Sequence, residues 1–301
     1  MRVLQVNAVY GVGSTGVIVE DIHKLSIEKG IESYVAYSAT NKSKVPNGYR
    51  IGNNLGKKIH ALFSRINGMQ AYFSRNATRE FLRYIDEIKP DIVHLHNLHS
   101  NYINLNMLLK YLAKNDIKTV ITLHDCWFYT GGCFHYTSSD CYKWLSGCGN
   151  CPKKMSDTPA YLFDRSKDIL ADRKELFGKI KNLTVTGVSQ WILDEAKRGI
   201  FRENNGVVIY NGVDTDIFCS TTSDLRKKYG CEDKFVILAP ANKMLNPVNK
   251  AVFERVVESL DDNTVMWLLA CPTDKRSNLP KNVIPIDFIA EREELIKLYS
   301  A

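Results

Sequence analysis

Apolar, β-branched runs alternate with amphipathic stretches along most of this chain. Residues 3–9 form the first run, residues 17–29 then carry apolar side chains at helical spacing, and a second run follows at 31–37. Further strands are predicted from residue 91 and at 118–123, 183–188 and 207–210, with helices at 105–114, 164–180 and 192–198. Parallel strands need a crossover between them, usually a helix, so this order predicts an α/β chain with mainly parallel sheets and helices on both faces.

Length and charge indicate the number of domains and the kinds of partner to expect. A chain of 301 residues predicts two domains. Its net charge of +7 favours anionic partners such as phosphates, nucleotides or an acidic membrane surface. Basic residues are spread along the chain, so nucleic acid is not an expected partner. No run approaches the ~18 apolar residues of a membrane span, and residues 3–9 are too short for a secretory signal. We therefore expect a cytoplasmic protein.

Residues 56–88 are predicted to be helical, with basic and aromatic side chains interleaved. A helix of this kind fits the surface of a membrane, so peripheral association with its inner face is one interpretation. The other is a core helix with a solvated basic face.

A glycine-rich turn, residues 11–16, follows the first predicted strand. It has the spacing Gly-x-Gly-x-x-Gly, but no acidic residue ends the second strand as a dinucleotide site requires. Glycine lets a backbone approach a ligand closely, and the N-terminus of the helix that follows favours anions. Gly13, Ser14, Thr15 and Gly16 are therefore candidate phosphate-binding residues, and a tight turn without a ligand is the alternative.

Histidines stand at the ends of two predicted strands. His94 and His96 share one face of the strand that starts at residue 91, and His124 and Asp125 follow the strand 118–123 directly. In open α/β sheets, ligands bind at the carboxyl ends of the strands. We take His124 as the centre of a site. The earlier histidines, His94, His96 and His99, either pack and form hydrogen bonds or contribute to a metal site.

The segment 124–152 is rich in cysteine. Cys126 is interpreted as a small buried thiol, with a nucleophile as the alternative. Four further thiols could surround one tetrahedral zinc ion that orders the loop, or they could be reduced thiols or disulfides. These candidate ligands are Cys133, Cys141, Cys148 and Cys151.

Several motifs together resemble the retaining glycosyltransferases of family four, which have the GT-B fold, and the branch that makes exopolysaccharide and colanic acid is the most similar. The motifs that carry the resemblance are Asn7…Gly13-Ser-Thr-Gly16, His94-Leu-His-Asn97-Leu-His99, Thr122-Leu-His124-Asp125-Cys-Trp127, Cys148-Gly-Asn-Cys151-Pro152 and Tyr210-Asn211-Gly-Val-Asp214.

The resemblance implies two Rossmann-like domains, an acceptor domain at 1–210 and a donor domain at 211–301. It also implies a hexosyltransferase that uses a nucleotide-diphosphate sugar, a saccharide or lipid-linked saccharide acceptor and no catalytic metal. His124 would contact the donor sugar, and the turn 13–16 the donor phosphates or the acceptor. The further substrate-binding candidates are His96, Asn97, Asp125 and Ser189.

Two departures from the family pattern affect these expectations. Family members place an Arg-Lys pair for the diphosphate where this chain has Pro247 and Val248, so Lys243 or Lys250 would have to substitute. Family members also continue past the position of Ala301 with a paired-glutamate motif. We therefore expect a fragment or truncated product with an incomplete donor domain, an uncovered apolar face and impaired activity. The alternative is an inactive, zinc-stabilised module that binds a glycan or a protein.

Overall fold

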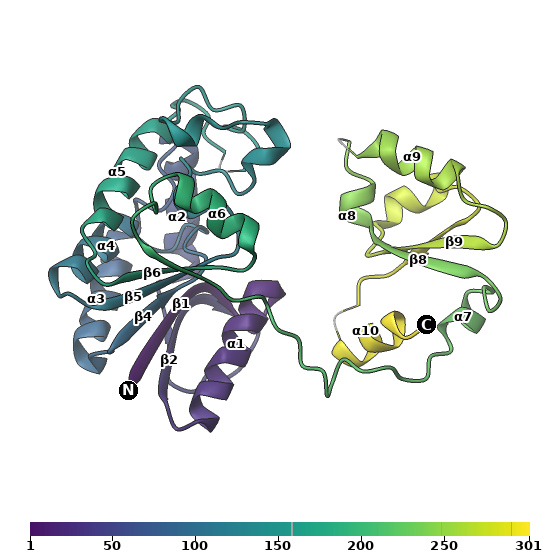
Figure 1. Ribbon diagram of the computed structural model, residues 1–301, viewed down its shortest axis with the longest axis horizontal. Coiled ribbons are helices and arrows are strands. Elements are labelled where there is room, and N and C mark those ends of the chain that lie inside the picture. Colours follow the sequence, from purple (N-terminus) through teal and green to yellow (C-terminus); the bar gives the residue numbers. More distant parts are fainter. Residues whose placement is uncertain (158, 248, 290) are drawn as a thin grey trace. The chain divides into compact units, whose positions relative to one another are not determined.

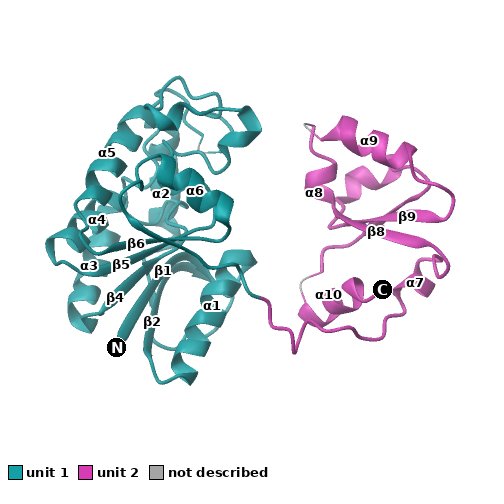
Figure 2. Ribbon diagram, in the orientation of Figure 1, with its two compact units in different colours: residues 1–212 teal, residues 213–301 magenta. Residues whose placement is uncertain are grey.

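The computed structural model describes every residue except 158, 248 and 290. Two compact units are present, Met1–Gly212 and Val213–Ala301 (Figure 2). None of the helices in the described part of the chain has the length and apolar character needed to cross a bilayer.

The first unit contains a seven-stranded sheet in the order β3-β2-β1-β4-β5-β6-β7, and all of its strand pairs are parallel. This architecture confirms the predicted α/β fold class with a parallel sheet. The strands are β1 (Arg2–Tyr10), β2 (Glu32–Thr40), β3 (Gly48–Arg50), β4 (Ile92–Leu95), β5 (Lys118–Leu123), β6 (Leu183–Gly187) and β7 (Asn205–Val208).

Helices cover both faces of this sheet. On one face α3, α4 and α5 form a layer, and on the other α1 packs against β1 and β2 while α6 packs against β6 and β7 (Figure 1). The main core lies between the sheet and the α3–α5 layer and includes Leu4, Phe81, Leu109 and Phe177. The helices are α1 (Gly13–Glu28), α2 (Asn54–Asn67), α3 (Arg75–Ile88), α4 (Leu105–Lys114), α5 (Ser166–Gly178) and α6 (Gln190–Arg198).

The prediction of one helix over 56–88 is wrong, because the chain turns between α2 and α3. Gly68, Ala71 and Ser74 all have positive φ angles, of 76°, 66° and 53°. Only the glycine adopts this conformation without strain. Tertiary contacts hold the turn, since the backbone N–H of Leu105 donates to the carbonyl of Ala71 at 2.7 Å.

The second unit contains a three-stranded parallel sheet in the order β10-β9-β8. Its α8 and α9 lie on one side of the sheet and its α7 and α10 on the other (Figure 2). Phe253 and Val257 of α9 pack on one face, and Leu298 of α10 packs near Trp267 on the opposite face. The elements are α7 (Leu225–Lys228), β8 (Phe235–Pro240), α8 (Ala241–Met244), α9 (Lys250–Glu258), β9 (Thr264–Leu269), β10 (Val283–Ile286) and α10 (Arg292–Tyr299).

Buried clusters therefore occupy both faces of this smaller sheet. The predicted uncovered apolar face is wrong for the described residues, because α9 and α10 close the two sides. Exposed apolar side chains remain outside these clusters, for example Phe235 and Phe288.

Candidate active site

Two histidines meet at the carboxyl ends of β4 and β5. Nδ1 of His96 lies 3.0 Å from Nε2 of His124, and the two rings are stacked with centroids 5.3 Å apart. The parallel register of β4 and β5 places Leu95 beside Ile121, so the residues that follow both strands reach the same edge of the sheet. His96 is fully buried and His124 is partly exposed. The structure thus brings together two residues that the sequence predicted for one site.

A third histidine extends this pair into the sheet. The ring of His94 lies 4.0 Å from that of His96, which confirms that the two share one face of the strand. Nε2 of His94 contacts the Thr122 hydroxyl at 2.7 Å. Burial, and then the neighbouring His124, lower the pKa of His94 to about 4. Burial also lowers the pKa of His96 and of His124. All three imidazoles are therefore neutral at neutral pH and can act as hydrogen-bond donors or acceptors.

The protonation state of the buried histidines makes stability depend on pH. Burial lowers the pKa of His60 and His94 to about 4 in the folded protein, whereas the unfolded value is about 6.5. Their contribution is complete above about pH 6.5 and is lost as the pH falls toward about 4, at up to about 1.4 kcal/mol per pH unit for each histidine. We expect urea unfolding at about pH 7 and about pH 5 to show this loss. His60→Gln should reduce the slope, and equal stability at both pH values would contradict the assignment.

Asp125 holds the chain after β5 in place. Its Oδ1 accepts from the backbone N–H of Trp127 at 2.8 Å, and its Oδ2 lies 3.1 Å from Nε2 of His99. Nε1 of Trp127 donates to Gln70 Oε1 at 2.9 Å. The sequence suggested His99 only as one of three possible metal ligands, and its contact with Asp125 was not predicted. No sequence signal points to Gln70.

The glycine turn lies at the same edge of the sheet, where β1 ends, and only β4 separates β1 from β5. Helix α1 starts at Gly13, and among the residues that the structure describes no side chain caps its N-terminus. A Cβ atom on Gly16 would lie 3.0 Å from a methyl group of Val9, so a glycine there lets α1 pack closely on β1. Gly13, Ser14 and Thr15 are accessible to solvent. Free N–H groups at a helix N-terminus suit an anion.

Asn97 and Ser189 follow β4 and β6. The Asn97 backbone is fixed, because its N–H donates to Oδ1 of Asn7 at 3.0 Å and its carbonyl accepts from Ala8 and Tyr102. The Ser189 hydroxyl accepts from the N–H of Ile192 and caps α6. Ser189 therefore has a structural role at its own helix.

Lys243 and Lys250 belong to the second unit. Lys243 is exposed on α8, and Lys250 forms an exposed ion pair of 3.7 Å with Glu254. Pro247 precedes α9, and Val248 lies outside the described residues. Both lysine side chains are exposed to solvent.

The four candidate zinc ligands line one small pocket together with Trp144 and Ser166. Among the described residues, however, no group of three or more His, Cys, Asp or Glu side chains is arranged to hold a metal ion. The predicted zinc site is therefore not supported. A hydrogen bond from the Cys133 thiol lowers the pKa of Cys151 to about 7 and raises that of Cys133. Cys126 is fully buried, and burial raises its pKa, so it is a poor nucleophile.

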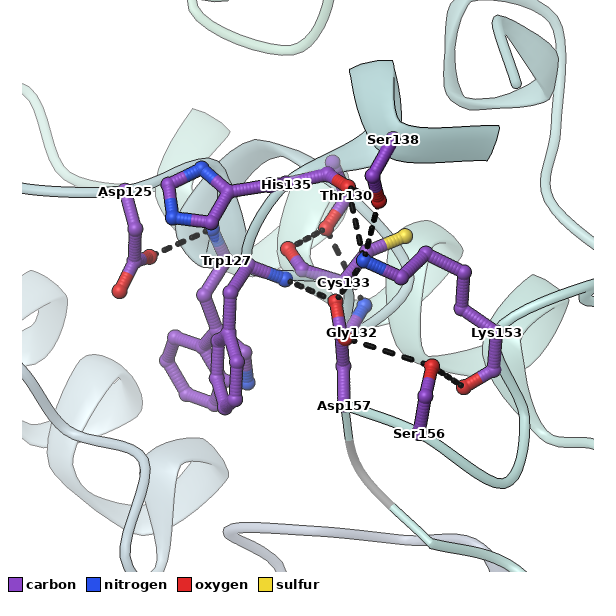
Figure 3. Close-up of polar contacts among 11 residues, drawn as sticks. Asp125, Trp127, Thr130, Gly132, Cys133, His135, Ser138, Lys153, Ser156 and Asp157 are labelled. Atoms are coloured by element: carbon purple, nitrogen blue, oxygen red, sulfur yellow. Dashed lines mark hydrogen bonds and ion pairs between the residues drawn. The ribbon is translucent and has the colours of Figure 1, made fainter. Parts of the chain in front are cut away.

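Polar contacts take the role that zinc was expected to play in ordering the loop (Figure 3). The Lys153 ammonium lies 2.8 Å from Asp157 and donates to the His135 carbonyl at 2.8 Å. Asp157 also accepts from the backbone N–H of Phe134, and the Thr130 hydroxyl donates to the Cys133 carbonyl, both at 2.9 Å. The side chains of Lys153 and Asp157 are only 12% and 13% exposed, so solvent screens this ion pair weakly.

Comparison with known proteins supports the same family. A family model described as Glycosyltransferase Family 4 matches residues 16–217, more than half of the chain. A relative named as a colanic acid biosynthesis glycosyl transferase, WcaC of Escherichia coli (strain K12), is 24% identical over 253 residues, which are 79% of this chain and 61% of that protein. The chain thus spans less than two thirds of this relative's length.

Solved structures share the fold at low sequence identity. Sucrose-phosphate synthase from Thermosynechococcus elongatus has a TM-score of 0.60 at 11% identity, over 99% of this chain and 73% of that one. WaaG, a glycosyltransferase involved in lipopolysaccharide biosynthesis, has 0.57 at 12%, over 99% and 72%. HepE of Anabaena, in complex with UDP and glucose, has 0.53 at 12%, over 99% and 71%. These likenesses confirm the predicted GT-B-like fold.

Proposed function

Because the chain belongs to glycosyltransferase family 4, we propose that it transfers a hexosyl group from a nucleotide-diphosphate sugar to a saccharide or lipid-linked saccharide acceptor, with retention of configuration. The product would be part of a surface polysaccharide, as the name of the WcaC relative suggests. The observation that carries the proposal is the pair of neutral imidazoles, His96 and His124, at the edge of the sheet where α/β folds bind ligands.

His124 is proposed to contact the donor sugar, and His96 to hold it in position. In the tautomer in which Nδ1 of His96 donates to Nε2 of His124, the second imidazole carries its proton on Nδ1. That N–H is then available to a sugar hydroxyl. A neutral donor suits this step, because it can bond to the sugar without repelling a cationic, oxocarbenium-like centre.

Gly13–Gly16, at the N-terminus of α1, are proposed to contact the donor phosphates or the acceptor. For the second unit taken by itself, Lys243 and Lys250 are the cations proposed for the diphosphate. Retention by front-face attack brings the acceptor hydroxyl in beside the departing diphosphate. The protein then has two tasks, to position the reactants and to stabilise charge on the leaving group. Asn97 and Asp125 are proposed to shape the acceptor side.

A second candidate function is a binding module that recognises a glycan or a protein without turnover. The observation that favours it is the pairing of Lys250 with Glu254, which places a carboxylate beside one of the two cations proposed for the diphosphate. In either case we propose a cytoplasmic location, with peripheral attachment to the inner face of the membrane.

Donor binding is the direct test of the proposal. We expect one nucleotide class in a panel of UDP-, GDP- and ADP-sugars to raise the free energy of unfolding by about 2.7 kcal/mol at about 100 times its Kd. Thermal unfolding of the protein with each compound measures this. The matched controls are the free sugar and inorganic diphosphate. If no sugar nucleotide shifts the transition but an oligosaccharide does, the binding module is the correct function.

A further inference from the structure

A large cavity lies beside the histidine site. It has a volume of about 460 Å³ and is formed by the segment 51–53 that follows β3, by α2, by the start of α3 and by Tyr102. Tyr102 connects the two regions, because it lines the cavity and its hydroxyl donates to the carbonyl of Asn97 at 3.1 Å. The proposed chemistry does not use this cavity.

The polar end of the cavity has hydrogen-bond donors without partners. Ser74 precedes α3, but its hydroxyl contacts Nδ1 of His60 at 2.7 Å and no side chain caps that helix. The first N–H groups of α3, at Arg75 to Ala77, therefore have no side-chain acceptor at the cavity wall. His60 is 1% exposed, and its Nε2 has no hydrogen-bond partner within the described part of the chain. An unpaired buried nitrogen in the lining of a cavity points to a ligand that would satisfy it.

The charge of this end is positive. Lys57 and Arg75 line the cavity, against one carboxylate from Glu80. Burial, and then the nearby charge of Arg50, lower the pKa of Lys57. Helix α2 carries no acidic residue, and its N-terminus adds a partial positive charge near Lys57. These groups suit a small, strongly charged anion such as a phosphate group.

The other wall of the cavity is apolar and continues onto the outside of the molecule. Ile59 and Phe63 line the cavity, yet they are 47% and 49% exposed. Further exposed apolar side chains lie on the same face of α2, at Leu55, Leu62 and Ile66. The exposed segment 161–163, which is Tyr-Leu-Phe, extends this surface, because its backbone bonds to the carbonyls at the end of α2.

We propose that this cavity binds the phosphate-bearing headgroup of a lipid whose chains lie along the exposed apolar face of α2. The phosphate would contact Lys57, Arg75 and the N-terminus of α3, and it would accept a hydrogen bond from His60. Polar contacts at one end and an open apolar surface at the other match an amphiphile better than a soluble phosphate. A role for this lipid as the sugar acceptor would rest on the proposed function, whereas the binding itself does not.

Flotation of the intact protein with lipid vesicles tests the proposal. We expect binding to phosphatidylcholine vesicles that contain phosphatidic acid, and little binding to phosphatidylcholine alone. Arg75→Glu should weaken binding about tenfold or more, because it reverses a charge at the headgroup. Arg83→Glu is the matched control, since it makes the same change on an exposed part of the same helix and should leave binding within about threefold. Leu62→Ser should weaken binding without changing a charge.

Each other outcome overturns the proposal. Equal losses in Arg75→Glu and Arg83→Glu would mean non-specific attraction to a charged surface. Inorganic phosphate that binds as tightly as the lipid would identify a soluble ligand. Circular dichroism of each variant excludes unfolding as the cause of a loss. Because the assay contains no sugar donor, lipid binding without transfer removes only the proposed function, and transfer without lipid binding removes only this inference.

Discussion

His124→Ala is expected to lower the rate of sugar transfer by at least about 100-fold, because it removes the proposed hydrogen bond to the donor sugar at the reacting centre. His124 is partly exposed and lies at the end of β5, so its loss should leave the fold intact. The main effect should be on kcat. Steady-state kinetics with the donor identified by thermal unfolding measure the change in kcat. Calorimetry measures acceptor binding, which should be retained.

Two further variants separate contact with the sugar from packing among the histidines. His96→Asn should lower kcat less than His124→Ala, since His96 acts through the 3.0 Å contact with His124. His94→Asn is the matched control, because it changes the same ring stack one layer deeper and should lower stability but leave kcat within about threefold. If His94→Asn reduces kcat as much as His124→Ala, the stack has a structural role and His124 does not contact the sugar.

The hydrophobic pattern of the sequence predicted helices and strands well where the pattern was regular. The bounds of β5 and α4 agree with the ranges expected from the sequence, because a β-branched run and a helical apolar repeat each allow one interpretation. The break between α2 and α3 was not predictable in the same way. Positive φ angles at Ala71 and Ser74 oppose local preference, and the contact of Ala71 with the distant Leu105 is not visible in the local pattern.

The candidate site was also predictable in part. The rule that strand ends share one edge of a sheet was enough to bring His96 and His124 together, because it depends on topology alone. The contacts of Asp125 with His99 and of Trp127 with Gln70 depend on the path of loops, which pattern does not specify. The four cysteines were correctly placed near one another, but thiol spacing does not decide between a metal site and reduced thiols.

The structural role of Arg173 was not predictable from the sequence. It lies in a helix with many charged residues, where solvation is the default expectation, yet it is fully buried. Its Nη1 donates to the carbonyls of Trp127 and Thr130, the second at 2.7 Å, and its guanidinium carbon lies 3.8 Å from the centroid of the Trp127 ring. Burial lowers its pKa to about 10, so it remains charged at neutral pH. One cation therefore fixes the segment that directly follows His124 and Asp125.

Arg173→Ala is expected to lower the free energy of unfolding by about 4 kcal/mol, because it leaves two buried carbonyls without a donor and removes the packing against Trp127. Since Asp125 bonds to the N–H of Trp127, the same change should also lower transfer. Urea unfolding measures the first effect. Lys174→Ala is the matched control, since the neighbouring side chain on α5 is exposed, and it should change stability by less than about 0.5 kcal/mol. An equally small loss of stability in Arg173→Ala would have another meaning. The guanidinium nitrogens Nε and Nη2 have no hydrogen-bond partner in the described part of the chain, and the cost of burying them would then cancel what the guanidinium contributes. In that case the ion pair between Lys153 and Asp157, and not Arg173, would stabilise the segment 124–152.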